Sequence, residues 1–126
     1  MKQFFTALLF LFCTAPIAGQ SGTDSTQVIF CKVTELPRAF NSPRINIDMG
    51  TASVFPGLNF PYLLEKGTNH PIKFTSAIDA LNLLSAHGWQ LGDSGLASLE
   101  GGTVLYYYLM QLKVRKDNGG QYHIAQ

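Results

Sequence analysis

The sequence has little charge, and this scarcity excludes two classes of partner. Only 13% of the 126 residues are charged, and nine basic residues against eight acidic ones give a net charge of +1 at pH 7. Because binding to nucleic acid or to an anionic membrane surface depends on clustered positive charge, neither is expected. The apolar fraction of 46% argues against a disordered chain and predicts a packed globular domain.

Residues 1–19 contain no acidic residue and are strongly apolar. Lys2 gives the segment a positive start, an apolar run follows at residues 4–12, and small residues after Pro16 lead to Gly19. This order is typical of a cleavable secretory signal, and we place the cut after Gly19. The run is shorter than the roughly 20 residues of a membrane span, so no stable membrane anchor is expected. The mature chain is predicted to be exported, periplasmic or secreted, and soluble.

Cysteine is almost absent, and no disulfide is expected in the mature chain. Cys13 leaves with the signal, and Phe12 before it is not the small residue that lipidation requires. Cys31 then remains alone. It shares one side of a predicted strand with Ile29 and Val33, which indicates a buried, inert thiol. The alternative is a nucleophile with one of the histidines as its base.

The histidines and carboxylates form no recognisable site in the sequence. The three histidines lie at positions 70, 87 and 123, at intervals that match no zinc motif. Glu35 and Asp48 would face each other across a first hairpin as an acid and a base, or would lie on a solvated strand edge. We therefore assign no catalytic residue, no metal ligand and no cofactor.

Hydrophobic periodicity predicts one α+β domain at residues 27–115, between a flexible leader at 20–26 and a polar tail at 116–126 that is expected to fray. The expected architecture is an antiparallel sheet of four or more strands with one α-helix packed across one face. Alternation and turn signals predict strands at residues 28–36, 44–49, 62–65, 72–74, 89–91 and 103–115.

The helix is marked at both ends. Ser76 is expected to cap its N-terminus, with Asp79 in the first turn where an acid is favourable. Gly88 is expected to end it in the left-handed conformation. Trp89 follows directly and is expected to plug the junction between helix and sheet, the alternative being a platform for a ligand.

This helix, together with Gly88-Trp89 and the later strand Tyr106-Tyr107-Tyr108-Leu109, resembles a family of small exported bacterial proteins of unknown function. Members look like strand, strand, helix, Gly-Trp-Glu, strand, strand, and their last strand is rich in aromatic residues. The strand at residues 45–50 is similar to the one that precedes the helix in these proteins. Gln90 stands where the family usually has glutamate. The resemblance spans residues 27–115 and implies a fold but no known activity.

The last long strand is apolar on both faces at its centre. Because neighbouring strand residues point to opposite sides, Tyr106 and Tyr108 are expected under the helix and Tyr107 on the second face. One helix covers only one face of a sheet, so the second face needs another cover. The available covers are the apolar segment that contains Phe55, Leu58, Phe60 and Tyr62, or a second molecule.

These patterns favour a non-catalytic exported binding or protein-interaction module that uses the second sheet face. The partner classes left open are a second copy, an envelope protein, a peptide and a glycan. The alternative is a small envelope hydrolase or an inhibitor of one, which a deep polar pocket with a histidine beside Cys31 or a carboxylate would favour. The residues predicted for the interface are Leu105, Tyr107, Leu109, Phe55, Phe60 and Tyr62.

Overall fold

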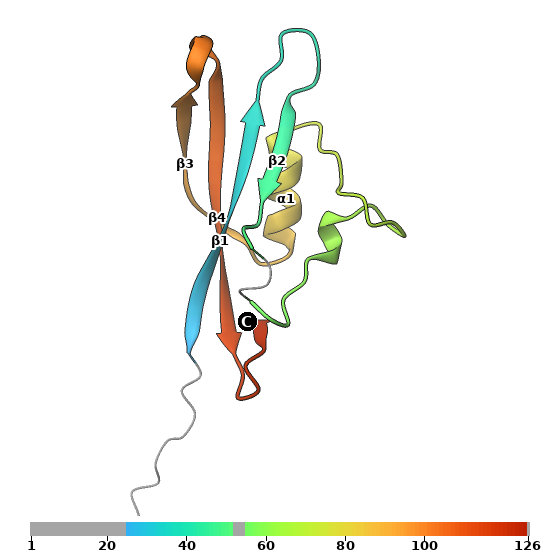
Figure 1. Cartoon of the computed structure of the whole chain (residues 1–126), viewed down its shortest axis with the longest axis vertical. Coiled ribbons are helices and arrows are strands. Elements are labelled where there is room, and N and C mark those ends of the chain that lie inside the picture. Colours follow the sequence, from blue (N-terminus) through green and yellow to red (C-terminus); the bar gives the residue numbers. More distant parts are fainter. Residues whose placement is uncertain (1–24, 52–54, 126) are drawn as a thin grey trace, which may run out of the picture.

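A computed structural model describes residues 25–51 and 55–125; the predicted signal and most of the predicted leader lie outside the described residues. A five-stranded antiparallel sheet and one helix form the framework, which confirms the predicted α+β class (Figure 1). Its elements are β1 (Thr26–Leu36), β2 (Arg44–Asp48), the 3₁₀ turn η2 (Pro61–Leu63), α1 (Ala77–Ala86), β3 (Gln90–Ser98), the 3₁₀ turn η3 (Glu100–Gly102), β4 (Val104–Lys116) and β5 (Tyr122–Ile124).

The long strands β1 and β4 form the centre of the sheet. The strand order is β2-β1-β4-β3, and β5 pairs with the C-terminal end of β4. β1 and β4 pair over ten positions, from Thr26 opposite Arg115 to Glu35 opposite Tyr106. Because every pairing is antiparallel, register alone decides which residues of neighbouring strands share a face.

The two faces of this sheet differ in what lies over them. Helix α1 and the segment at residues 55–74 lie on the same side (Figure 1). We call this side the covered face and the opposite side the open face. The buried core lies on the covered face and consists of Ile29, Cys31, Val33, Ala80, Leu84, Trp89, Met110, Leu112 and Val114. Over the open face lies no element of the described part of the chain.

Both ends of α1 are closed by local hydrogen bonds. The Ser76 hydroxyl accepts a bond from the Asp79 N–H at 3.2 Å, and the Thr75 hydroxyl donates to the Asp79 carboxylate at 3.0 Å. At the other end Gly88 has a φ of 93° and the Trp89 N–H donates back to the Leu84 carbonyl. The turn therefore directs Trp89 into the core beneath the helix.

The C-terminal tail does not fray, contrary to the sequence prediction. The Asp117 carboxylate accepts bonds from the N–H groups of Gly119 and Gln121, each at 2.9 Å, and this closes a turn. The chain then returns as β5, with Ile124 opposite Val114. A polar sequence therefore forms a strand because its turn satisfies its own backbone donors.

Residues 62–65 and 72–74 do not form the predicted pair of strands. They are replaced by the turn η2 and a single bridge between Leu64 and Pro71. The prolines at 61 and 71 lack the N–H donors that a ladder would need. Two bonds complete the arrangement, from the Ile72 N–H to the Leu63 carbonyl and from the Glu65 N–H to the His70 carbonyl.

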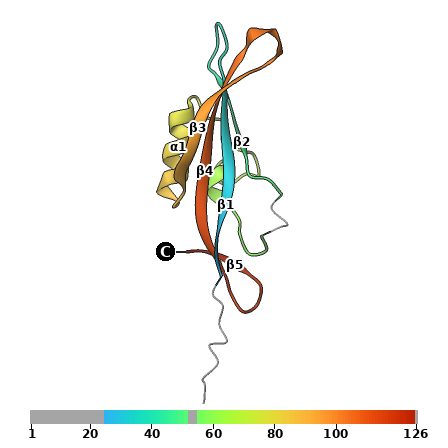
Figure 2. The same cartoon turned by 90° about the vertical axis from the view of Figure 1, so that its left-hand side faces the viewer.

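Two further strand boundaries and the exposure of one tyrosine differ from the prediction. β1 begins at Thr26, inside the expected leader, and the strand predicted to begin at residues 89–91 continues as β3 to Ser98. Tyr106 lies on the covered face but is 40% exposed, because the β3–β4 hairpin extends beyond the end of α1 (Figure 2). Tyr108, nearer the helix, packs against the core as expected.

Candidate functional site

The lone thiol is not arranged for catalysis. Cys31 is buried, and this burial, followed by the negative charge of Asp48, raises the pKa of its thiol to about 12. A thiol of that pKa stays protonated at neutral pH and is a poor nucleophile. Asp48 itself pairs in register with Lys32, whereas Glu35 pairs with Ile45, so the two acids lie on opposite faces rather than facing each other.

In the described part of the chain, no group of three or more His, Cys, Asp or Glu residues could hold a metal ion. His87 stacks on a tyrosine and His123 contacts Asp117 at 2.7 Å. His70 lies in the turn that Thr68 closes. The histidines are therefore separate features and do not meet at one site.

Tyr62, predicted for the second face, lies on the covered face beside Trp89. The Trp89 Nε1–H donates to the Tyr62 hydroxyl at 2.8 Å, and the Tyr62 ring stacks on His87 with centroids 3.7 Å apart. Burial raises the pKa of Tyr62. Phe60 packs against Trp89 with ring centroids 5.8 Å apart. Trp89 is thus enclosed by aromatic rings with its N–H satisfied, and it offers no exposed platform for a ligand.

Phe55 also lies on the covered face, where its ring meets Tyr122 edge to face at 5.3 Å. All three aromatic residues expected to cover the second face therefore pack on the other side of the sheet. The physical reason is that the core beneath α1 extends past the helix toward β5, and the segment at residues 55–62 fills that space. Of the two covers that the sequence left open, the loop is excluded.

The remaining predicted interface residues, Leu105, Tyr107 and Leu109, do lie together on the open face, and all three are half-buried. Two β1 residues on this face are more exposed, Phe30 at 53% and Val28 at 41%. The open face thus combines aliphatic and aromatic side chains over the two central strands.

Tyr107 lies across a glycine of the neighbouring strand. Gly95 is its register partner, and a Cβ added there would be 2.6 Å from the Tyr107 hydroxyl oxygen. The phenol ring therefore occupies the space that a side chain on β3 would fill, as aromatic residues do over strand glycines. This contact explains why Tyr107 is half-buried although nothing covers the open face.

Opposite charges flank the apolar centre of the open face in a single row. Lys32 of β1 and Asp93 of β3 are both register partners of Leu109 on β4. Both charged side chains are exposed. In the next row Thr34 and Gly95 flank Tyr107.

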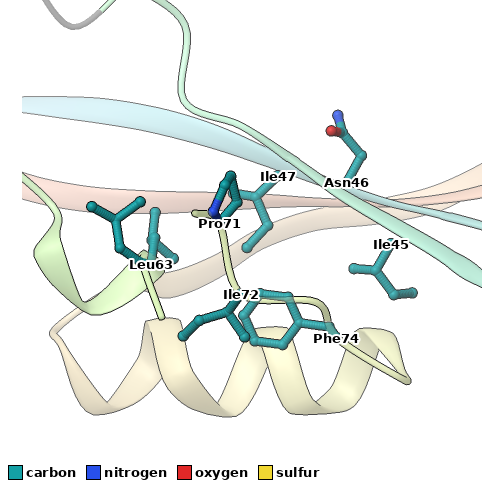
Figure 3. Close-up of a pocket in the computed structure, with 8 residues that line it drawn as sticks. Ile45, Asn46, Ile47, Leu63, Pro71, Ile72 and Phe74 are labelled. Carbon is teal, nitrogen blue, oxygen red and sulfur yellow. The ribbon is translucent and has the colours of Figure 1, made fainter. Parts of the chain in front are cut away.

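A pocket on the covered side was not predicted from the sequence (Figure 3). It measures about 260 Å³ and lies between β2 and the segment that follows η2. Figure 3 shows Ile45 and Ile47 directed toward the chain that carries Ile72, while Asn46 points away. Its lining residues are Ile45, Asn46, Ile47, Leu63, Leu64, Pro71, Ile72 and Phe74.

This pocket reaches the free edge of the sheet. β2 is an outer strand, and among the described strands it pairs only with β1. Because neighbouring strand residues point to opposite faces, a pocket lined by Ile45, Asn46 and Ile47 must extend along the strand edge. The edge carries backbone N–H and C=O groups that no described strand pairs.

Basic residues surround the outer end of the pocket. A second depression shares Ile45, Pro71, Ile72 and Phe74 with it and adds Arg38, Arg44 and Lys73. All three cations are exposed, and none forms an ion pair with another described residue. The sequence signal was the alternation of basic and apolar residues at Arg44-Ile45 and Ile72-Lys73-Phe74, but nothing in it brought these segments together.

No family model, curated protein or solved structure matches the chain. The resemblance to the exported bacterial family therefore rests on its motif alone. Among the helices of the described residues, none is long and apolar enough to cross a membrane.

Proposed function

We propose that the mature chain is an exported, non-catalytic module that binds an extended peptide along the free edge of β2. The observation that carries this proposal is the pocket of about 260 Å³ beside that edge. An outer strand offers unpaired backbone donors and acceptors, and a bound peptide satisfies them by adding one more strand. β2 has five residues, so a peptide of similar length matches it.

The pocket sets the side-chain preference of this peptide. Its walls are aliphatic and aromatic, with Ile45, Ile72 and Phe74 half-buried around it, so an aliphatic side chain fits there. The three cations at its outer end favour acidic residues beside that side chain. A fatty acid would share the apolar and anionic character but would leave the strand edge unpaired. The peptide is therefore the ligand that uses all three features.

Export is part of the proposal and rests on the signal-like segment at residues 1–19. Expression of the full chain in a secreting host, followed by intact-mass measurement, tests it. The expected product begins at Gln20 and is found outside the cytoplasm. A product that retains residues 1–19 would contradict export by cleavage.

Binding is tested with a synthetic peptide of five residues, acetylated and amidated at its ends, with a central isoleucine between threonines and a glutamate at each end. Titration into the labelled mature chain is followed by NMR. We expect saturable shifts of the β2 amides and of the Ile45, Ile47 and Ile72 methyl groups. A peptide with lysine in place of each glutamate is the matched ligand control and should bind about tenfold more weakly or worse.

Charge reversal at the basic rim provides the matched protein controls. Arg44→Glu with Lys73→Glu should weaken binding of the glutamate peptide by about tenfold, because two favourable contacts become repulsive. Lys113→Glu changes an exposed lysine on the open face and should leave the affinity unchanged. Equal affinity for both peptides, or shifts confined to the open face, would refute the peptide site.

A further inference from the structure

The open face carries an apolar centre that the proposed peptide site does not use. Leu105, Tyr107 and Leu109 follow one another along this face of β4, and the exposed Phe30 and Val28 of β1 extend the apolar surface beyond Leu109, opposite Gln111 and Lys113. The segment at residues 55–74, which the sequence offered as a cover, packs against the core on the covered face instead. Contiguous apolar surface of this kind usually marks a contact with another macromolecule.

One row of charges on this face is arranged for a second copy of the same chain. Lys32 and Asp93 lie in one row, one strand to either side of Leu109, and neighbouring strands are about 4.8 Å apart. Two copies can meet open face to open face across a two-fold axis that runs parallel to β4. Rotation about this axis exchanges the β1 side of that row with its β3 side. It therefore brings Lys32 of each copy over Asp93 of the other.

The side chains of the next row are compatible with the same axis. Tyr107 leans toward β3 and lies over Gly95, which leaves the small Thr34 on the β1 side of the row. Two-fold rotation carries the Tyr107 ring of one copy over Thr34 of the other. The two rings then lie side by side rather than colliding on the axis, as interleaving side chains do between packed sheets.

Neither member of the charged pair is already used. In the part of the chain that the structure describes, Lys32 and Asp93 form no ion pair, and Asp93 accepts one bond, from the Ser94 N–H at 2.8 Å. Asp48 is the register partner of Lys32 on the outer side, but its carboxylate accepts a bond from the Gly50 N–H. Lys32 and Asp93 therefore present exposed charges of opposite sign to whatever approaches the open face.

We propose that two copies of this chain pack open face to open face about a two-fold axis along β4, with reciprocal Lys32–Asp93 pairs. A second copy fits better than an unrelated partner because the row Lys32, Leu109, Asp93 is its own complement under that rotation, as an isologous interface requires. The exposed Lys113 also lies on β4, four residues from Leu109, so the same axis brings the two copies of Lys113 toward each other, and this repulsion opposes the Lys32–Asp93 pairs. The basic groove lies along the outer edge of β2, two strands away from the proposed axis on β4, with its apolar wall on the covered side.

Charge reversal with sedimentation analysis of residues 20–126 tests the proposal. The wild-type chain should dimerise at micromolar concentration. Lys32→Glu alone or Asp93→Lys alone should weaken dimerisation at least about tenfold, because each places like charges together twice. An equimolar mixture of the two single variants should form a heterodimer, because both pairs then join opposite charges. The double variant should also recover the wild-type dimer to within about threefold.

Several outcomes would overturn the dimer. They are a wild-type chain that stays monomeric at millimolar concentration, single variants that dimerise as the wild type does, and a mixture no more dimeric than its components. Thermal unfolding at low concentration serves as the folding control. Both side chains are exposed, so each variant monomer should retain the wild-type melting temperature. The peptide titration does not depend on this result, so either proposal can fail alone.

Discussion

The two faces of the same two strands have different roles in this molecule. On the covered face, β1 and β4 contribute Ile29, Val33 and Leu112, all buried beneath the helix and the segment at residues 55–74. One residue further along each strand, the side chains are aromatic, hydroxylated or charged, and most remain in contact with solvent. The alternation of a strand thus separates residues that hold the fold from residues free to bind.

The largest difference in stability between the two faces is expected when one leucine on each face is truncated to alanine. Leu112→Ala removes a fully buried side chain and should cost about 2–5 kcal/mol of unfolding free energy. Leu109→Ala truncates a half-buried residue on the open face and should cost the monomer clearly less. Urea unfolding at low protein concentration measures both. Equal losses would mean that the open face belongs to the folding core.

A smaller effect on the covered face is expected from Tyr62→Phe. This change removes the acceptor of the Trp89 Nε1–H bond and leaves a buried donor without a partner, at a cost of about 1–3 kcal/mol. Tyr106→Phe, at an exposed position, is the control and should be nearly neutral. Unfolding followed by Trp89 fluorescence compares them. A neutral Tyr62→Phe would show that water replaces the hydroxyl.

On the open face, Gly95→Ala should change the position of Tyr107 more than the stability of the monomer. The added methyl group would collide with the end of the phenol ring, which is free to rotate away. Alanine is favoured over glycine in a strand by about 0.5–1 kcal/mol, which offsets the lost contact. Ring NMR signals of Tyr107 should move, whereas Ser94→Ala on the same strand should leave them in place. Unmoved signals would contradict the contact.

The smallest expected effect is local and depends on pH. The hydrogen bond from His123, followed by the bonds from the backbone N–H groups of Gln121 and Gly119, lowers the pKa of Asp117. A carboxyl with a depressed folded-state pKa stabilises the turn above its unfolded value of about 3.9 and loses that contribution as pH falls through the folded value. The protection factors of the β5 amides, which correct for the intrinsic pH dependence of exchange, should therefore fall below about pH 4 while those of the β1 amides do not.

Asp117→Asn is the control for this pH response. It removes the titrating group, so the β5 protection factors should be low already at neutral pH and should show no further step on acidification. An identical acid response in the variant would assign the effect to another group.

Local signals in the sequence were sufficient to predict the helix and the strands whose apolar and polar residues alternate clearly. Ser76 and Gly88 mark the ends of α1 by chemistry confined to a few residues, and β2 alternates cleanly. Only the start of β3, at residues 89–91, was predicted, because Gly92, Asp93 and Gly95 disfavour a strand in isolation. It is a strand because β4 pairs with it, which is a long-range contribution.

The candidate sites likewise divide into those that one strand alone predicts and those that only the folded chain assembles. Alternation placed Tyr107 with Leu105 and Leu109, because period two follows from one strand alone. It could not place Phe55, Phe60 and Tyr62, since a segment interrupted by prolines and glycines has no fixed relation to either face. The pocket beside β2 also escaped, because its walls come from two segments that only the folded chain brings together.

The pairing of β1 with β4 has a consequence for the time course of folding. Each β1 residue meets its β4 partner about 70 to 90 positions later in the chain. Contacts so distant in sequence carry a large loop-closure cost, and domains dominated by them fold in milliseconds to seconds rather than microseconds. We expect α1 and the β3–β4 hairpin to form first and β1 to dock last, so that pulse-labelled amides of β1 gain protection after those of β3.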